Sequence, residues 1–165
     1  MPKSITIGEI LNKEHYVQVT GNEKALERPI YVAEINRPGF ELAGFFKHSD
    51  FRRIIIFGDK ESAFINEMSE ERQREIFPFL INEEVPCIII AKGNECPPIL
   101  IEIAKQKDFP IFVTEAATGR VSIELTNKLD EALAPETLIH GVFLNIYGKG
   151  VIIKGDSGIG KSEIA

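Results

Sequence analysis

Tryptophan is absent from this 165-residue sequence, and cysteine and long apolar runs are scarce. The two cysteines, Cys87 and Cys96, are too few for a disulfide framework, and they show no spacing typical of metal ligands. No apolar run approaches the length of a membrane span, and the N-terminus lacks the basic and apolar segments of a secretory leader. These absences argue against a secreted or membrane-spanning protein. We expect a cytoplasmic protein with no membrane partner.

Positive charge is also in short supply, because 19 Lys and Arg face 25 Asp and Glu, for a formal net charge of -6. Residues 135–165 hold basic and acidic residues in equal number, so the acidic excess lies before Pro135. Nucleic-acid binding through a broad surface requires the opposite balance. The sequence therefore argues against a nucleic-acid partner, and we interpret the charged residues as an ordinary solvated surface.

The most informative feature present is a complete phosphate-binding loop. Residues 155–162, GDSGIGKS, fit the Walker A pattern G-x-x-x-x-G-K-[ST] at every fixed position. The glycines let backbone N–H groups turn toward phosphates, Lys161 adds a positive charge, and the Ser162 hydroxyl can bind Mg²⁺. We predict an ATP site with Ser162 as metal ligand, formed by Gly155, Asp156, Ser157, Gly158, Ile159, Gly160, Lys161 and Ser162.

The surroundings of this loop carry both support and a difficulty. Residues 150–154, GVIIK, predict the buried strand that precedes such a loop, although a glycine-rich turn between two core elements is the alternative. The sequence continues for only three residues after Ser162. A P-loop domain also needs a parallel sheet and a second acidic residue for magnesium. We therefore expect these residues to belong to a longer protein and to lack kinase activity by themselves.

Short apolar runs alternate with helical segments between residues 53 and 134. Strands separated by helices of this length pair in parallel through right-handed crossovers. We therefore predict an α/β fold: a small N-terminal α/β domain with a largely parallel sheet over residues 1–134, followed by the start of a P-loop catalytic domain over residues 135–165. The expected strands are 53–57, 87–91 and 110–113, with helices over 59–68, from Ser69, 97–105 and 119–133. Asp59 and Ser69 are the expected N-caps.

Several residues near strand ends are weaker candidates for a second site. Gly58 and Gly93 follow expected strands at the edge where open α/β sheets bind ligands, and Glu115 and Arg120 follow the third strand. A single glycine after a strand is common, so a structural role is the favoured interpretation.

The segment RPGFELAG, residues 37–44, contains two further candidates, Arg37 and Glu41. A turn at Pro38 and Gly39 before a short helix explains most of this pattern, so we favour structural roles here as well. His15 and His48 are interpreted as surface residues.

Three segments together resemble the bacterial HPr kinase/phosphorylase family: RPGFELAG at 37–44, IHGV at 139–142 and GDSGIGKSE at 155–163. The resemblance implies ATP-dependent phosphorylation of a serine on the phosphocarrier protein HPr, phosphate-dependent removal of that phosphate, and a role in carbon catabolite regulation. It also implies a Mur ligase-like N-terminal domain, a kinase domain similar to phosphoenolpyruvate carboxykinase, and a homohexamer. His140 and Lys161 become catalytic candidates, and the family's catalytic aspartate would lie beyond Ala165.

Two other functions stay open from the sequence. The eight loop residues would equally suit a P-loop small-molecule kinase. Alternatively, the chain could be an isolated regulatory or assembly domain without activity. A lone histidine in an apolar strand usually makes local hydrogen bonds, so the catalytic role of His140 depends on the resemblance alone.

Overall fold

The computed structural model describes residues 2–135. The described residues form a five-stranded sheet, whose strand order is β2-β7-β6-β5-β4. The three strands within residues 54–113 make up its parallel centre. Strands β4 (Ile35–Asn36), β5 (Ile54–Phe57), β6 (Ile88–Ile90) and β7 (Ile111–Val113) pair in parallel, and β2 (Val17–Thr20) pairs antiparallel with β7. The predicted α/β fold with a largely parallel sheet is thus confirmed for this part of the chain.

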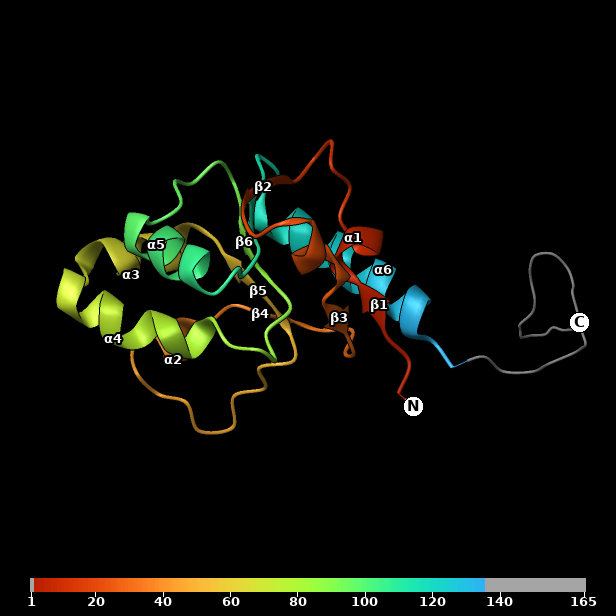
Figure 1. Ribbon diagram of the computed structural model, residues 1–165, viewed down its shortest axis with the longest axis horizontal. Helices are drawn as coiled ribbons and strands as arrows, with labels where there is room; N and C mark the ends of the chain where they lie inside the picture. Colours follow the sequence, from red (N-terminus) through yellow and green to blue (C-terminus); the bar gives the residue numbers. More distant parts are fainter. Residues whose placement is uncertain (1, 136–165) are drawn as a thin grey trace, which may run out of the picture. The chain divides into compact units, whose positions relative to one another are not determined.

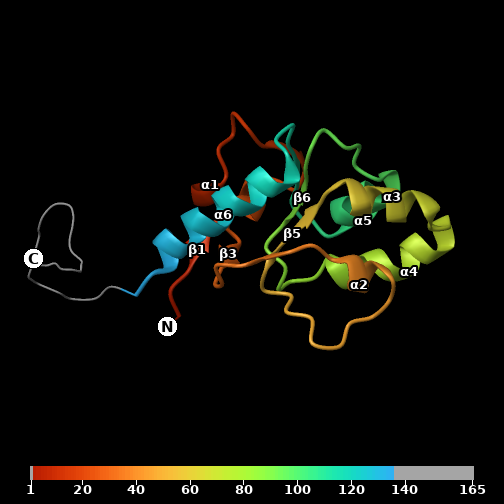
Figure 2. The ribbon, with the colours of Figure 1, turned by 180° about the vertical axis from the view of Figure 1, so that it is seen from behind.

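Helices cover both faces of the sheet (Figures 1 and 2). One face carries α2 (Gly39–Leu42), α3 (Asp59–Glu67), α4 (Glu70–Leu80) and α5 (Pro98–Gln106), and the other carries α1 (Ile7–Ile10) and α6 (Thr118–Leu133). A short antiparallel pair, β1 (Ile5–Thr6) and β3 (Pro29–Ile30), and the 3-10 helix η1 (Glu23–Glu27) complete the described elements. The order is therefore three layers, helices on sheet on helices.

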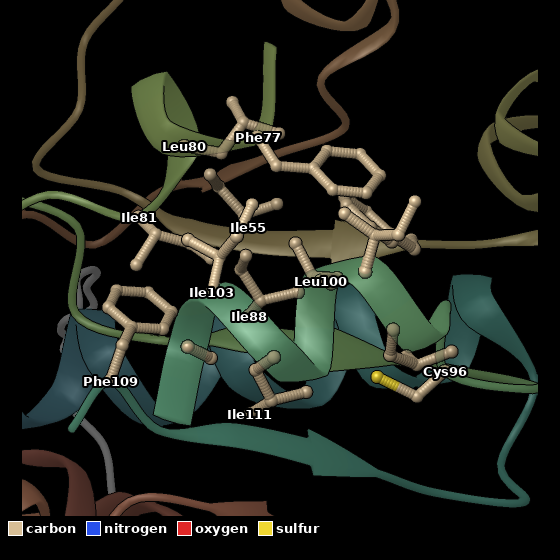
Figure 3. Close-up of a cluster of buried hydrophobic side chains, with 14 of the residues drawn as sticks. Ile55, Phe77, Leu80, Ile81, Ile88, Cys96, Leu100, Ile103, Phe109 and Ile111 are labelled. Carbon is tan, nitrogen blue, oxygen red and sulfur yellow. The ribbon is translucent and has the colours of Figure 1, made fainter. Parts of the chain in front are cut away.

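Alternation along the strands divides the apolar core into two clusters. In β5, the side chains of Ile55 and Phe57 join one cluster while those of Ile54 and Ile56 join the other, and all four are buried. A strand buried on both faces needs an unbroken apolar run, which is why IIIF has no polar residue. Figure 3 shows the first cluster, where Leu100 and Ile103 of α5 pack over the sheet.

The edge strand β2 is joined to the sheet partly by a side chain. Its register with β7 shifts between Gln18 and Thr20, so the regular backbone ladder is interrupted there. The buried Thr20 hydroxyl donates to the Phe109 carbonyl at 2.6 Å and accepts from the Ile111 N–H at 3.1 Å. These two bonds satisfy backbone groups that the irregular pairing would leave without a partner.

The expected elements agree with the structure to within a few residues, with one corrected cap. Ser69 is the N-cap of α4 as expected, because its hydroxyl accepts from the Arg72 N–H at 3.1 Å. The expectation that Asp59 caps α3 is wrong: Gly58 is the N-cap, and α3 begins at Asp59. The reason is that Glu61, three residues on, accepts the Gly58 N–H at 2.6 Å. The compact unit extends through Leu133, and the domain division at residue 134 stays a prediction.

Candidate functional site

The predicted nucleotide site lies outside the described residues. This applies to every residue of the loop from Gly155 to Ser162, to His140, and to the strand expected at 150–154. Their assigned roles in ATP binding, catalysis and metal binding therefore stay predictions. The described domain contains a second candidate site, which its own geometry defines.

An open cleft of about 570 Å³ lies at the carboxyl ends of the parallel strands. Its walls come from four connections, one after each of β4, β5, β6 and β7. Ligand sites in open α/β sheets occur at this edge because the connections there diverge to the two faces. The residues that line the cleft are Arg37, Asp59, Lys60, Glu61, Lys92, Ala117, Thr118 and Gly119.

Glu61 joins two of these connections. One of its carboxylate oxygens, Oε1, accepts from the Gly58 N–H at 2.6 Å and from the Arg37 Nε and Nη2 groups at 3.0 and 2.8 Å. Glu61 is 6% exposed, so its negative charge depends on these donors for compensation. This ion pair fixes Arg37 beside the cleft. Arg37 therefore has the structural role expected for it, and its position also allows contact with a ligand in the cleft.

Asp59 joins the next two connections. Its two carboxylate oxygens accept from Lys92 Nζ at 2.6 Å and from Asn94 Nδ2 at 3.1 Å. Both hydrogen bonds hold the pKa of the Asp59 carboxyl below its usual value, and the one from Lys92 has the larger effect. Lys92 has a φ of 60° and Gly93 a φ of 68°, so two consecutive residues adopt the left-handed region and the chain turns sharply after β6.

Gly58 is required because two side chains approach its backbone closely. A β-carbon at this position would lie 2.7 Å from Thr118 Oγ1 and 2.8 Å from Arg37 Nη2. The Gly58 φ of -109° is open to any residue, so the constraint is space and not backbone strain. The glycine thus lets the start of α6 close over the end of β5.

We expect Gly58→Ala to lower the free energy of unfolding by about 1 to 3 kcal/mol through overpacking. Urea unfolding measures this, with Gly119→Ala as the matched control, because a β-carbon at Gly119 meets nothing within 4 Å. Thr118→Ala in the Gly58→Ala background should recover part of the loss. Equal stability of Gly58→Ala and the parent protein would contradict the close approach.

A second cleft of about 330 Å³ lies at the same edge, beside β7 and the start of β2. It brings together the sequence candidates Glu115 and Arg120 with His15 and Glu124. Tyr16 also lines it, and burial, followed by the charge of Glu124, raises the pKa of its phenol to about 12. Three acidic residues, Glu14, Glu115 and Glu124, line this cleft together with one arginine, Arg120. The second cleft is therefore less suited than the first to an anionic ligand.

The remaining sequence candidates have structural or surface positions. Glu41 of α2 is buried and accepts from the Ser49 hydroxyl at 2.7 Å, which ties the helix to the following loop. Pro38 is the N-cap of α2, in agreement with the turn expected there. His15 and His48 are exposed, as expected.

Sequence reasoning missed Lys60, Lys92 and Thr118 as members of the first cleft. Each comes two to five residues after the end of a strand, which is the one signal that could have found them. Within residues 2–135, no group of three His, Cys, Asp or Glu is placed to hold a metal ion. No helix of this described part has the length and apolar character needed to cross a membrane.

Comparison with known proteins identifies relatives over the whole chain. The family descriptions "HPr Serine kinase N terminus" and "HPr Serine kinase C-terminal domain" match residues 5–129 and 131–165. The HPr kinase/phosphorylase of Bacillus cereus (strain G9842) is 38% identical to the chain, that of Bacillus mycoides (strain KBAB4) 37% and that of Bacillus anthracis (strain A0248) 36%. Each match covers 100% of this chain and 53% of the relative, so the chain spans about half the length of these proteins.

Among solved structures, the CBS and DRTGG domains of the regulatory region of Clostridium perfringens pyrophosphatase align with a TM-score of 0.47 and 19% sequence identity. That alignment covers 75% of this chain and 48% of the other. The family resemblance seen in three sequence segments is confirmed by the whole-chain relatives. Because a family description matches most of the sequence, the chain belongs to the HPr serine kinase family.

Proposed function

We propose that the chain is part of an enzyme that phosphorylates a serine of HPr with ATP and removes that phosphate by attack of inorganic phosphate. The observation that carries this proposal is the whole-chain similarity to proteins named HPr kinase/phosphorylase, together with an intact Walker A loop at residues 155–162. The relatives' length supports a further catalytic segment in the complete protein. The proposed setting is the cytoplasm, with HPr as partner and a homohexamer as the assembly.

In the forward reaction, the serine hydroxyl oxygen attacks the γ-phosphorus of ATP and the bond to ADP breaks. The loop's backbone N–H groups and Lys161 would hold the phosphates and stabilise the charge on the transferred group. Bound Mg²⁺ would neutralise part of the phosphate charge, with the Ser162 hydroxyl among its ligands. The serine proton would pass to an aspartate of the longer protein, and His140 would lie in the same active site.

In the reverse reaction, an oxygen of inorganic phosphate attacks the phosphorus of phosphoserine, and the bond to the serine oxygen breaks. The products are pyrophosphate and the free serine of HPr, which takes up a proton. A loop that binds the terminal phosphates of ATP can also bind phosphate and pyrophosphate, because its donors recognise phosphate oxygens and no base or sugar. One pocket would therefore serve both directions.

A phosphotransfer assay on the full-length protein tests this function against that of a P-loop small-molecule kinase. With ATP and Mg²⁺, we expect phosphoserine to form on HPr. HPr in which the acceptor serine is replaced by alanine is the control and should stay unlabelled. Phosphorylation of small hydroxyl acceptors without labelling of HPr would overturn the proposal.

We expect Ser162→Ala in the full-length enzyme to raise the Mg²⁺ concentration needed for half-maximal kinase activity by about tenfold or more. The variant loses a proposed metal ligand, and even outer-shell partners of metals contribute roughly tenfold in metal affinity. The assay is kinase rate across a Mg²⁺ titration. Ser157→Ala is the matched control, because position 157 is not a fixed Walker A position. An unchanged Mg²⁺ dependence in Ser162→Ala would rule out the assigned ligand.

A further inference from the structure

The cleft beside Gly58 occupies the point where the sheet's connections change sides. The chain leaves β6 for α5 on one face and leaves the neighbouring strand β7 for α6 on the other. Connections that diverge in this way leave a crevice at the strands' carboxyl ends, and small ligands bind in such crevices. The volume of about 570 Å³ is within the range of small-molecule sites.

The charges that line this cleft favour an anion. Three cations, Arg37, Lys60 and Lys92, face two carboxylates, Asp59 and Glu61. Both carboxylates already accept hydrogen bonds from the protein's own donors, as described above. Among the described residues, Lys60 has no ion pair, and its side chain is exposed at the start of α3. The cleft therefore has an unpaired positive charge in a chain whose net charge is -6.

Backbone donors add to these cations from the opposite wall. The first backbone hydrogen bond at the start of α6 runs from the Val121 N–H to the Ala117 carbonyl at 3.0 Å. Within the described structure, the N–H groups of Thr118, Gly119 and Arg120 have no protein acceptor, and the alanine before the helix has no side chain to cap them. Thr118 and Gly119 line the cleft. These donors supply directional hydrogen bonds that the cations alone would not.

We infer that this cleft is a binding site for a small organic phosphate. The phosphate group of the ligand lies between the start of α6 and the side chains of Arg37 and Lys60. The cleft exceeds the size of a phosphate ion, so the remaining volume takes the organic part of the molecule. The residues of this site are different from those of the Walker A loop, and the proposal stands whether or not the proposed kinase function does. It gives the N-terminal domain a ligand of its own.

The test uses the whole chain with Lys161→Ala, which removes the Walker A lysine as a competing phosphate ligand. Backbone amide NMR signals are followed while inorganic phosphate or glycerol 3-phosphate is added at constant ionic strength. We expect saturable shifts at Thr118, Gly119 and Arg120, with tighter binding of glycerol 3-phosphate. Absence of saturable shifts there would overturn the site. Equal affinity for the two probes would overturn the organic ligand class.

Gly119→Asp separates binding from folding. An aspartate in the first turn of α6 is favourable for the helix but places a negative charge where the phosphate would bind. We expect an unchanged or higher melting temperature and an affinity reduced about tenfold or more, whereas Gly119→Ala should keep both. Lys60→Gln should weaken binding in the same direction. Parent-like affinity in Gly119→Asp would contradict the proposed position of the phosphate.

Discussion

Lys161→Ala in the full-length enzyme is expected to slow both the kinase and the phosphorylase reaction by roughly 10² to 10³. One ammonium group would stabilise the transferred phosphoryl group in either direction, so its removal should raise both barriers by about 3 to 4 kcal/mol. The measurement compares the variant with the parent enzyme in the two assays. Loss of the kinase reaction with an undiminished phosphorylase reaction would show that the two directions use different pockets.

Folding provides the control for this variant. A lysine that binds a ligand from a glycine-rich loop fills no part of an apolar core, so its truncation opens no cavity. The melting temperature of Lys161→Ala should therefore stay within the error of the parent's. A large drop in melting temperature together with lost activity would point to damage of the fold instead of loss of a phosphate ligand.

Arg28→Ala is expected to destabilise the N-terminal domain by about 3 kcal/mol, the largest effect we expect of any substitution in the described residues. The Arg28 guanidinium donates to the carbonyls of Asn82 and Pro86 at 2.9 and 3.1 Å, and also to those of Glu83 and Val85. It also lies 5.1 Å from the centre of the Phe109 ring. Its loss would leave several carbonyls between α4 and β6 without a donor and remove a cation–π contact.

Thermal unfolding measures this effect, and the expected drop in melting temperature is about 10 °C for a domain of this size. Arg74→Ala is the matched control. Arg74 pairs with Glu102 at the surface, where both side chains are 48% exposed, so its loss should cost about 1 kcal/mol or less. Equal melting temperatures for the two variants would contradict the role given to Arg28.

The parallel centre of the sheet was predictable because its sequence pattern is local. Three apolar runs, each followed by a helical segment, predict β5, β6 and β7 even when the strands they pair with are unknown. The short elements before residue 50 were not predictable in this way. Strands such as β1 and β4 have two residues each, and β2 is defined by antiparallel pairing with β7, more than ninety residues later. Such strands depend on distant partners and carry little periodicity of their own.

Only part of the first cleft can be predicted from the sequence, because most of its residues carry no local signal. Gly58 stood out because a glycine after a strand is a local signal. Lys60, Lys92 and Thr118 resemble ordinary surface residues in sequence, and only the sheet topology brings them to one edge. Asp59 was expected to cap a helix, and it is instead the acceptor that joins Lys92 to α3.

The central claim is that a single phosphate-binding loop supports transfer in both directions, and ³¹P NMR of the full-length enzyme tests it most directly. Phosphoserine-HPr is incubated with inorganic phosphate, enzyme and Mg²⁺, and the products are followed by their phosphorus signals. We expect pyrophosphate to appear as the phosphoserine signal disappears, in equal amounts, and ATP to compete with phosphate for the reaction. Release of free phosphate from phosphoserine-HPr without pyrophosphate would contradict it.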